Sequence, residues 1–137
     1  LLRNRLKYAL YREAQHILHE GIASKEDIDI AVTYSIGRRL PITGPFMSAD
    51  MGGLDVFSAI SDYLFKDLSK ADQSLPLLKK LVQQNKLGTK TGEGYYLWDK
   101  DFSEQMNNKR EQELIRFLKQ DKDNKQVNII QISLSKS

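Results

Sequence analysis

The chain has 137 residues, of which 40% are hydrophobic and 28% charged, with a net charge of +3 and no cysteine. This predicts one globular domain with a modest core, and it excludes a disulfide framework and thiolate chemistry. Basic and acidic residues are interleaved and no long apolar run occurs, so we expect no nucleic-acid partner, no membrane span and a cytoplasmic protein.

The first 37 residues predict two helices. Apolar side chains recur at steps of three and four over residues 1–20, which is typical of an amphipathic helix, and Gly21 is expected to end it. Ser24 is expected to cap a second helix, with Asp27 three residues later in an acidic first turn. That helix is predicted to continue to Gly37.

Further helices are predicted beyond a proline-containing turn. Pro41 and Pro45 exclude regular helix across 38–45. The helical stretches expected after this turn are 45–52, 54–64 and 76–85.

The segment 86–98 contains three glycines and ends in an aromatic cluster. Its glycines, Gly88, Gly92 and Gly94, follow the order Gly-x-x-x-Gly-x-Gly. This order matches neither a phosphate-binding P-loop nor the Gly-x-Gly-x-x-Gly dinucleotide fingerprint. Taken alone, the segment is predicted to be a tight connection held by its aromatic residues.

The C-terminal part is predicted to differ from the rest. Residues 103–119 predict a polar surface helix, and 121–125 read as a solvated linker. Apolar and polar residues then alternate over 130–135, which indicates either a disordered segment or an edge strand that pairs with another copy. We therefore expect a helical domain over 1–119 and an extension over 120–137.

Four blocks in this order resemble the C-terminal domain of the 3-hydroxyacyl-CoA dehydrogenase family. The blocks are Asn4-Arg5-Leu6, the corner from Glu20 to Asp29, the turn from Thr43 to Asp55, and the glycine segment from Lys86 to Trp98. The resemblance covers residues 1–99. Each block is weak alone, and the ordered set is specific.

The resemblance implies an all-α fold, a helical dimerisation domain like the C-terminal domain of 6-phosphogluconate dehydrogenase. It also implies a homodimer and an upstream nucleotide-binding domain, which would bind NAD and supply the catalytic histidine. The chain also opens inside a helical pattern without an upstream cap, so we expect it to be part of a longer protein. The whole enzyme would oxidise a (3S)-3-hydroxyacyl-CoA substrate to 3-oxoacyl-CoA in fatty-acid metabolism, and this chain alone would be inactive.

Asn4 is the candidate catalytic residue. The resemblance implies that its side chain reaches the cleft between the domains, where an amide can both donate and accept a hydrogen bond. The alternative is an Asn that caps the start of the helix. His16 and His19 share one helix face, but no third ligand is signalled, so they are expected to be surface residues and no metal site is predicted.

Arg38 and Arg39 are the candidate substrate-binding residues. They stand in a turn that is longer than the turn common in the family. A longer turn that carries Arg resembles the branch of the family that includes carnitine- and gulonate-type dehydrogenases and some short-chain acyl-CoA enzymes. A guanidinium there would hold a substrate carboxylate or a CoA phosphate, and the alternative is a solvated basic turn. Two other functions therefore stay open: an NAD-dependent dehydrogenase of a carboxylated hydroxy acid, and a helical association module without chemistry.

Overall fold

The structure is a computed structural model that describes residues 1–135, with side chains described through residue 124. Within these residues every regular element is helical, and the only extended pairings are isolated bridges in the glycine segment. The predicted all-α fold is therefore confirmed. The chain divides into two compact units, Leu1–Gln84 and the residues from Asn85 onward.

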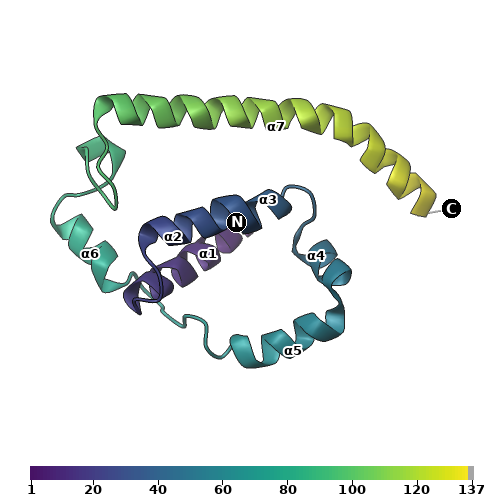
Figure 1. Cartoon of the computed structure of the whole chain (residues 1–137), viewed down its shortest axis with the longest axis horizontal. Helices are drawn as coiled ribbons and strands as arrows, with labels where there is room; N and C mark the ends of the chain where they lie inside the picture. Colours follow the sequence, from purple (N-terminus) through teal and green to yellow (C-terminus); the bar gives the residue numbers. More distant parts are fainter. Residues whose placement is uncertain (136–137) are drawn as a thin grey trace. The chain divides into compact units, whose positions relative to one another are not determined.

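Figure 1 shows the helices in chain order. The first unit contains α1 (Leu2–His19), α2 (Lys25–Ala31), the π-helical turn η1 (Val32–Ile36), α3 (Gly37–Arg39), α4 (Pro45–Gly52), α5 (Leu54–Leu64) and α6 (Pro76–Gln83). The second unit contains the 3₁₀ turn η2 (Thr89–Thr91) and α7 (Lys100–Ser135). No helix in the described part of the chain is long and apolar enough to cross a membrane.

The connection between α1 and α2 has the signals that the sequence predicts. Gly21 adopts a φ of 70°, and its N–H donates to the Leu18 carbonyl at 3.1 Å. The hydroxyl of Ser24 accepts a hydrogen bond of 3.1 Å from the N–H of Asp27. Because both helix ends find hydrogen-bond partners, the two helices meet at a defined corner.

The second predicted helix is interrupted by the π-helical turn η1. Thr33 Oγ1 donates to the Asp29 carbonyl at 2.8 Å, and the N–H of Gly37 donates to the Val32 carbonyl. A Cβ at position 37 would lie only 2.6 Å from that carbonyl oxygen. Gly37 therefore permits the wider turn instead of ending the helix, which continues as α3.

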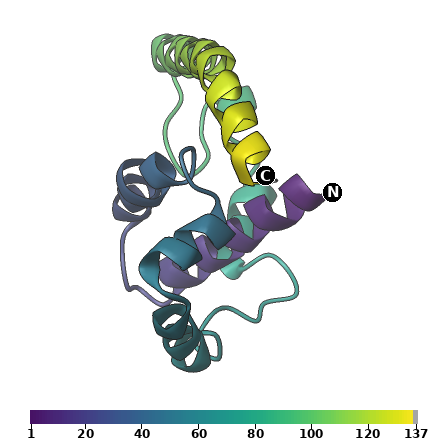
Figure 2. The same cartoon turned by 90° about the vertical axis from the view of Figure 1, so that its right-hand side faces the viewer.

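Polar side chains of α1 hold the irregular segment that joins α5 to α6, which Figure 2 shows from a second side. Glu13 Oε2 accepts a hydrogen bond of 2.8 Å from the N–H of Ser69. Gln15 Oε1 accepts one of 3.2 Å from the N–H of Leu75. Ser69 is the most enclosed point of this contact, with 7% of its surface exposed. Side chains on two sides of α1 therefore help to order this loop.

Apolar side chains do not form a closed core within residues 1–124. None of the hydrophobic residues described is buried, and Phe46, Met51 and Leu54 expose 87%, 78% and 60% of their surface. This differs from the modest core that the length predicts. The contacts between helices mostly join neighbours in the chain, such as α1 with α2 and α4 with α5, so no second layer covers the apolar faces.

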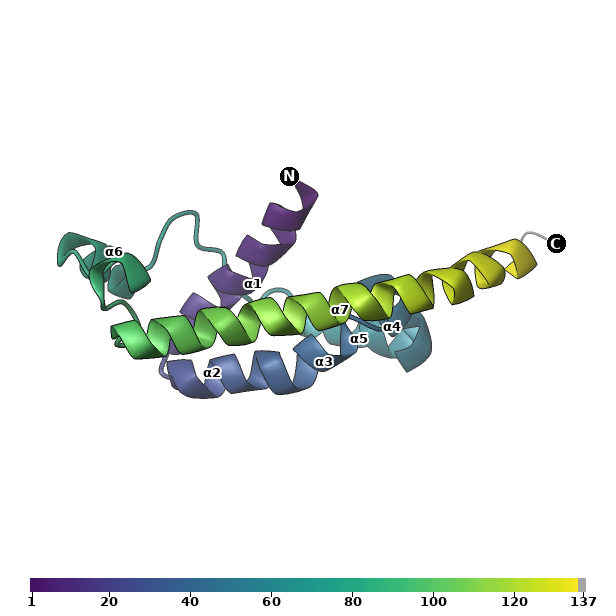
Figure 3. The same cartoon turned by 90° about the horizontal axis from the view of Figure 1, so that it is seen from above.

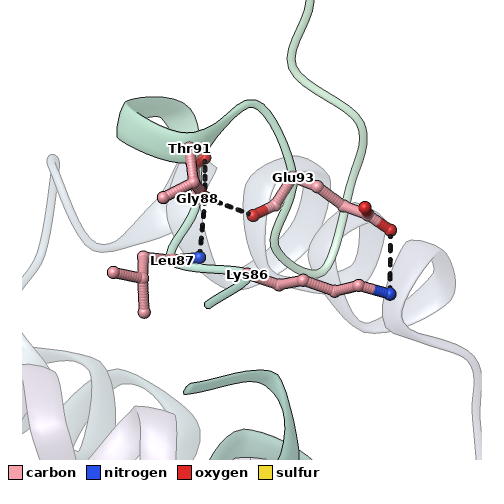
Figure 4. A network of polar contacts seen from close by, with 5 residues as sticks. All are labelled: Lys86, Leu87, Gly88, Thr91 and Glu93. Carbon is pink, nitrogen blue, oxygen red and sulfur yellow. Dashed lines mark hydrogen bonds and ion pairs between the residues drawn. The ribbon is translucent and has the colours of Figure 1, made fainter. Parts of the chain in front are cut away.

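The glycine segment forms the tight connection that the sequence predicts (Figure 4). Thr91 Oγ1 accepts a hydrogen bond of 2.8 Å from the N–H of Leu87 and lies 3.0 Å from the Glu93 carbonyl. The N–H of Gly88 donates to the same carbonyl at 2.8 Å. A Cβ on Gly94 would lie 2.9 Å from the Cα of Gly88, so only glycine allows the two strands of the loop to come this close.

The segment ends at α7, whose start is fixed by neighbouring side chains. Asp99 Oδ1 accepts a hydrogen bond of 2.7 Å from the N–H of Phe102, as an N-cap residue does. The rings of Trp98 and Phe102 lie 4.9 Å apart between centroids. Trp98 thus holds the loop against the first turn of α7.

The helix α7 continues to Ser135 without interruption in Figures 1 and 3, which corrects the prediction for the C-terminal extension. The strand or disordered segment expected over 130–135 is wrong for these residues, and so is the linker at 121–125. The boundary expected between 119 and 120 falls inside the helix. Residues 100–135 contain no glycine or proline to end a helix, and a short alternating run without a partner strand does not outweigh helix propagation. Residues 136 and 137 lie outside the described residues.

Candidate functional site

Asn4 lies inside α1, in the second half of its first turn. The N-cap position of α1 is Leu1, and its backbone carbonyl accepts from the N–H of Arg5 at 3.1 Å. Among the described residues the Asn4 side chain takes part in no hydrogen bond, and the residue is exposed. Asn4 therefore does not cap this helix, and its amide is available to a group outside the chain.

Asn4 shares one side of α1 with an aromatic pair. Tyr8 follows Asn4 by four residues, and Tyr11 follows Tyr8 by three, so these side chains lie along one face. The rings of Tyr8 and Tyr11 meet edge to face, with centroids 6.4 Å apart. Gln15, one turn farther along this face, holds the loop at Leu75. Asn4 therefore lies on a face of α1 whose other side chains have partners of their own.

Arg38 and Arg39 form the short helix α3, directly after the π-helical turn. The guanidinium of Arg38 lies over the ring of Tyr34, with its central carbon 4.7 Å from the ring centroid. This is a cation–π distance, and it holds the Arg38 side chain in one direction. Neither arginine takes part in the ion pairs found among residues 1–124.

The turn after Arg39 is tied down at both ends. The carbonyl of Arg39 accepts hydrogen bonds of 3.0 Å from the N–H groups of Ile42 and Thr43. The hydroxyls of Thr43 and Ser48 lie 2.9 Å apart, which connects the turn to α4. Pro45 occupies the first turn of α4, where its missing N–H costs nothing. The two arginines are thus carried on an ordered turn.

The structure does not join Asn4 to the arginine pair within the described residues. No hydrogen bond, ion pair or ring contact connects Asn4 with Arg38 or Arg39. The two candidate positions lie on separate helices of the first unit, α1 and α3. Any shared role would therefore pass through a group that both of them bind.

The histidines and acidic residues do not form a metal centre in the described residues. His16 and His19 lie in the last turn of α1, the end of the helix where the helix dipole stabilises positive charge. Among these residues no group of three or more potential ligands is close enough to hold a metal ion.

The pKa of Glu26 is lowered for a local reason. The backbone N–H at the start of α2 donates to its carboxylate, and Lys25 Nζ lies 3.1 Å from Oε1. Both contacts favour the charged form of an exposed group. The shift reflects the helix start and does not mark a catalytic acid.

The sequence analysis does not predict two features of the site. The stacking of Arg38 on Tyr34 has a visible signal, because the residues are four apart in a helical stretch. The attachment of the 69–75 segment to Glu13 and Gln15 has none, because these residues are about 60 positions apart from their partners.

Comparison with known proteins identifies the family. The family model for the C-terminal domain of 3-hydroxyacyl-CoA dehydrogenase matches residues 2–98. A 3-hydroxybutyryl-CoA dehydrogenase of Clostridioides difficile is 39% identical over 98 residues, 71% of this chain and 34% of that protein. The human mitochondrial hydroxyacyl-coenzyme A dehydrogenase is 42% identical over 95 residues, 68% of this chain and 29% of that protein.

A relative with a different name matches over a longer stretch. The 5-formyl-3-hydroxy-2-methylpyridine 4-carboxylate 5-dehydrogenase of Mesorhizobium japonicum is 33% identical over 112 residues, 82% of this chain and 36% of that protein. A crystal structure of a dehydrogenase of that name, described as an NAD+-dependent dismutase, superposes with a TM-score of 0.81 at 32% identity. The superposition covers 83% of this chain and 37% of the other.

The chain therefore spans about a third of the length of the relatives that it matches. Helices α1 to α6, the four ordered motif blocks and both candidate positions fall within the matched residues 2–98, and α7 lies beyond them. Since the family model covers well over half of the chain, this chain belongs to the 3-hydroxyacyl-CoA dehydrogenase family and carries its C-terminal domain.

Proposed function

We propose that this chain is the C-terminal domain of an NAD-dependent enzyme that oxidises (3S)-3-hydroxyacyl-CoA to 3-oxoacyl-CoA. The carrying observation is the family match over residues 2–98, with Asn4 exposed in α1 and unused by the chain itself. An upstream nucleotide-binding domain would hold NAD and the catalytic base. The Asn4 amide would bond the reacting oxygen or orient that base.

The exposed apolar faces support a homodimer as part of this proposal. Helices α4 and α5 carry exposed apolar side chains, with 43% to 87% of each residue's surface accessible within residues 1–124: Phe46, Met47, Met51, Leu54 and Phe57. Large exposed apolar surface marks interaction sites in soluble proteins. A second copy would supply the missing layer, so that this domain both lines the substrate cleft and joins two subunits.

A second substrate class is favoured by the arginine pair. Arg38 is held over Tyr34, and Arg39 lies beside it in a turn fixed to α4. A relative that matches 112 residues acts, by its name, on a pyridine 4-carboxylate. An arginine with a fixed direction binds a carboxylate well, because its N–H groups match the two oxygens. The alternative is therefore a dehydrogenase of a carboxylated hydroxy compound.

Steady-state kinetics on the full-length protein separate these functions. NADH formation would be compared for a short 3-hydroxyacyl-CoA and for a panel of carboxylated hydroxy compounds. The proposal expects the higher kcat/KM with the thioester. A higher value with a carboxylated compound supports the alternative, and inactivity with every substrate supports a module without chemistry.

Variants at the arginine pair sharpen the comparison. If Arg38 binds a substrate carboxylate, Arg38→Ala raises the KM for a carboxylated compound by about 10-fold or more, the equivalent of one charge-assisted hydrogen bond. Lys66→Ala is the matched control, because it removes one positive charge from the exposed turn that follows α5. An unchanged KM in Arg38→Ala and in Arg39→Ala assigns both arginines to a solvated turn.

A further inference from the structure

The helix α7 lies beyond the residues that the family model matches, and one row along it combines three apolar side chains with two charged ones. The family match ends at residue 98, and α7 begins at Lys100. Met106, Arg110, Leu114, Phe117 and Asp121 follow one another at steps of three and four, so they share one face of the helix. Leu118, beside this row, is 63% exposed.

Two apolar side chains of this row are partly exposed on α7. Leu114 is 53% and Phe117 is 40% exposed, although both point along the same face. A helix of 36 residues is about 54 Å long, and most of the stability of a helix in a protein comes from the packing of its apolar face. The row Met106–Asp121 is therefore accessible to a partner, and its charges indicate which partner would fit.

The two charges on this face are placed symmetrically. Arg110 and Asp121 lie at equal distances in sequence from the midpoint between residues 115 and 116. Leu114 and Phe117 have the same midpoint. Two copies of α7 packed antiparallel about that midpoint would place each Arg110 opposite the other copy's Asp121. Each Leu114 would lie opposite a Phe117.

We propose that α7 pairs antiparallel with α7 of a second copy of this chain, through reciprocal ion pairs between Arg110 and Asp121. Parallel pairing would set Arg110 against Arg110 and Asp121 against Asp121, which is repulsive. A partner other than a second copy would not need the charges to be reciprocal. The antiparallel pair satisfies both charges with one two-fold axis.

The flank of the row explains why Arg110 is the cation that serves the contact. The neighbouring Arg116 is already bound within its own helix, with Nη2 2.6 Å from Glu113 Oε2. Its guanidinium carbon also lies 5.9 Å from the centroid of the Phe117 ring. Arg110 and Asp121 take part in none of the ion pairs found among residues 1–124, and both are exposed.

Spin-label distances in the full-length protein test the geometry directly. This chain contains no cysteine, so single labels at Gln105→Cys and Gln112→Cys report on α7 once any upstream cysteines have been replaced. Both positions lie on the side opposite the row. In an antiparallel pair, the two copies of a labelled residue are separated along the helix axis. This separation is about 3 Å multiplied by the number of residues between the label and the midpoint. The offsets are about 10 Å for position 112 and about 30 Å for position 105.

The proposal expects a distance at Gln105→Cys that is longer than that at Gln112→Cys by at least about 10 Å. Equal distances would mean parallel pairing and would overturn it. The absence of any short distance at position 112 would also overturn it, because α7 would then pack elsewhere.

Charge reversal tests the ion pairs. Arg110→Asp and Asp121→Arg should each abolish the short distance at position 112. In either variant, residues 110 and 121 carry the same charge, so both contacts between the two copies become repulsive. The double reversal should restore it. Lys109→Asp is the matched control, because it makes the same change of charge one residue away and off the row. If Arg110→Asp keeps the short distance, or if the double reversal does not restore it, the ion-pair assignment is wrong.

Discussion

Asn4 is an exposed amide within the helix that opens this chain, and its side chain binds nothing among the described residues. Asn has a lower helix propensity than Ala. It does not cap α1, since the N-cap position is Leu1. Local stability therefore gives no reason for Asn at this position. A role toward a substrate or toward the catalytic base of another domain would give one.

The substitution Asn4→Ala should lower kcat in the full-length protein without lowering stability. A single positioned hydrogen bond in a transition state is worth on the order of 10²–10³ in rate. The KM should change less, because the substrate is held largely by other contacts. Since Ala favours helix, the melting temperature should stay the same or rise slightly. Steady-state kinetics and a thermal melt on the same variant measure both effects.

The variant Asn4→Asp is the control for shape, because Asp keeps the size of Asn and loses its N–H donors. It should also be impaired, since a carboxylate near the histidine proposed for the upstream domain would raise the pKa of that histidine. Normal kcat in Asn4→Ala together with a lower melting temperature would show that Asn4 serves the fold and not the reaction.

At the scale of single elements, the glycine segment depends on one hydroxyl. Thr91 Oγ1 accepts from the N–H of Leu87 at 2.8 Å and bonds back to the loop at Glu93. Replacing Thr91 with Val keeps the shape and removes these bonds, so the free energy of unfolding should fall by about 1 kcal/mol. Thr91→Ser should lose less, because it keeps the hydroxyl. Urea unfolding measures both, and equal loss in the two variants would contradict the assignment to the hydroxyl.

The sequence predicts most helices of this domain because their signals are local. The Ser24 cap, the Gly21 end and the proline at the start of α4 act within one turn of the chain, and each appears as predicted. The π-helical turn was missed because Gly37 usually ends a helix and here allows an extra residue in a turn. The length of α7 was not predicted, because the charged run 121–125 was interpreted as a linker and the alternation over 130–135 as a strand or a disordered segment.

The candidate site is less predictable from sequence. Residue types such as Asn4 and Arg38 can be proposed from motif order alone. Arg38 is oriented by Tyr34, four residues earlier, whereas a contact such as the bond from Ser69 to Glu13 joins residues too far apart in the sequence to be predicted from it. Whether Asn4 and the arginines act on one substrate depends on groups outside residues 1–135. Sequence patterns therefore locate candidate positions, and packing decides how they are used.

At the scale of the whole molecule, this chain alone should not bind NAD. A dinucleotide site needs glycines in the order Gly-x-Gly-x-x-Gly between a strand and a helix, and the described residues form no regular strand. Calorimetric titration of the 137-residue chain with NAD should show no saturable heat, while the full-length protein binds. Micromolar saturable binding to the chain alone would contradict the division of labour proposed for the two domains.

The last prediction is that the 137-residue chain is a dimer in solution, with a mass twice its own 15.8 kDa. The reason is the apolar surface of α4 and α5, where Phe46 and Met51 expose 87% and 78% of their area. Burial of this surface would stabilise the dimer by the hydrophobic effect, so raising the salt concentration should not dissociate it. Sedimentation at low and high salt measures this.

Arg110→Asp provides the control for the origin of that dimer. This substitution should separate the two α7 helices, but the measured mass should stay at that of two chains. The reason is that the apolar faces of the first unit are expected to carry the main contact. Loss of the dimer in Arg110→Asp would place that contact in α7 instead. A mass of one chain for the unaltered protein at high concentration would contradict the prediction outright, and it would leave the exposed faces of α4 and α5 to be covered by an upstream domain of the same subunit.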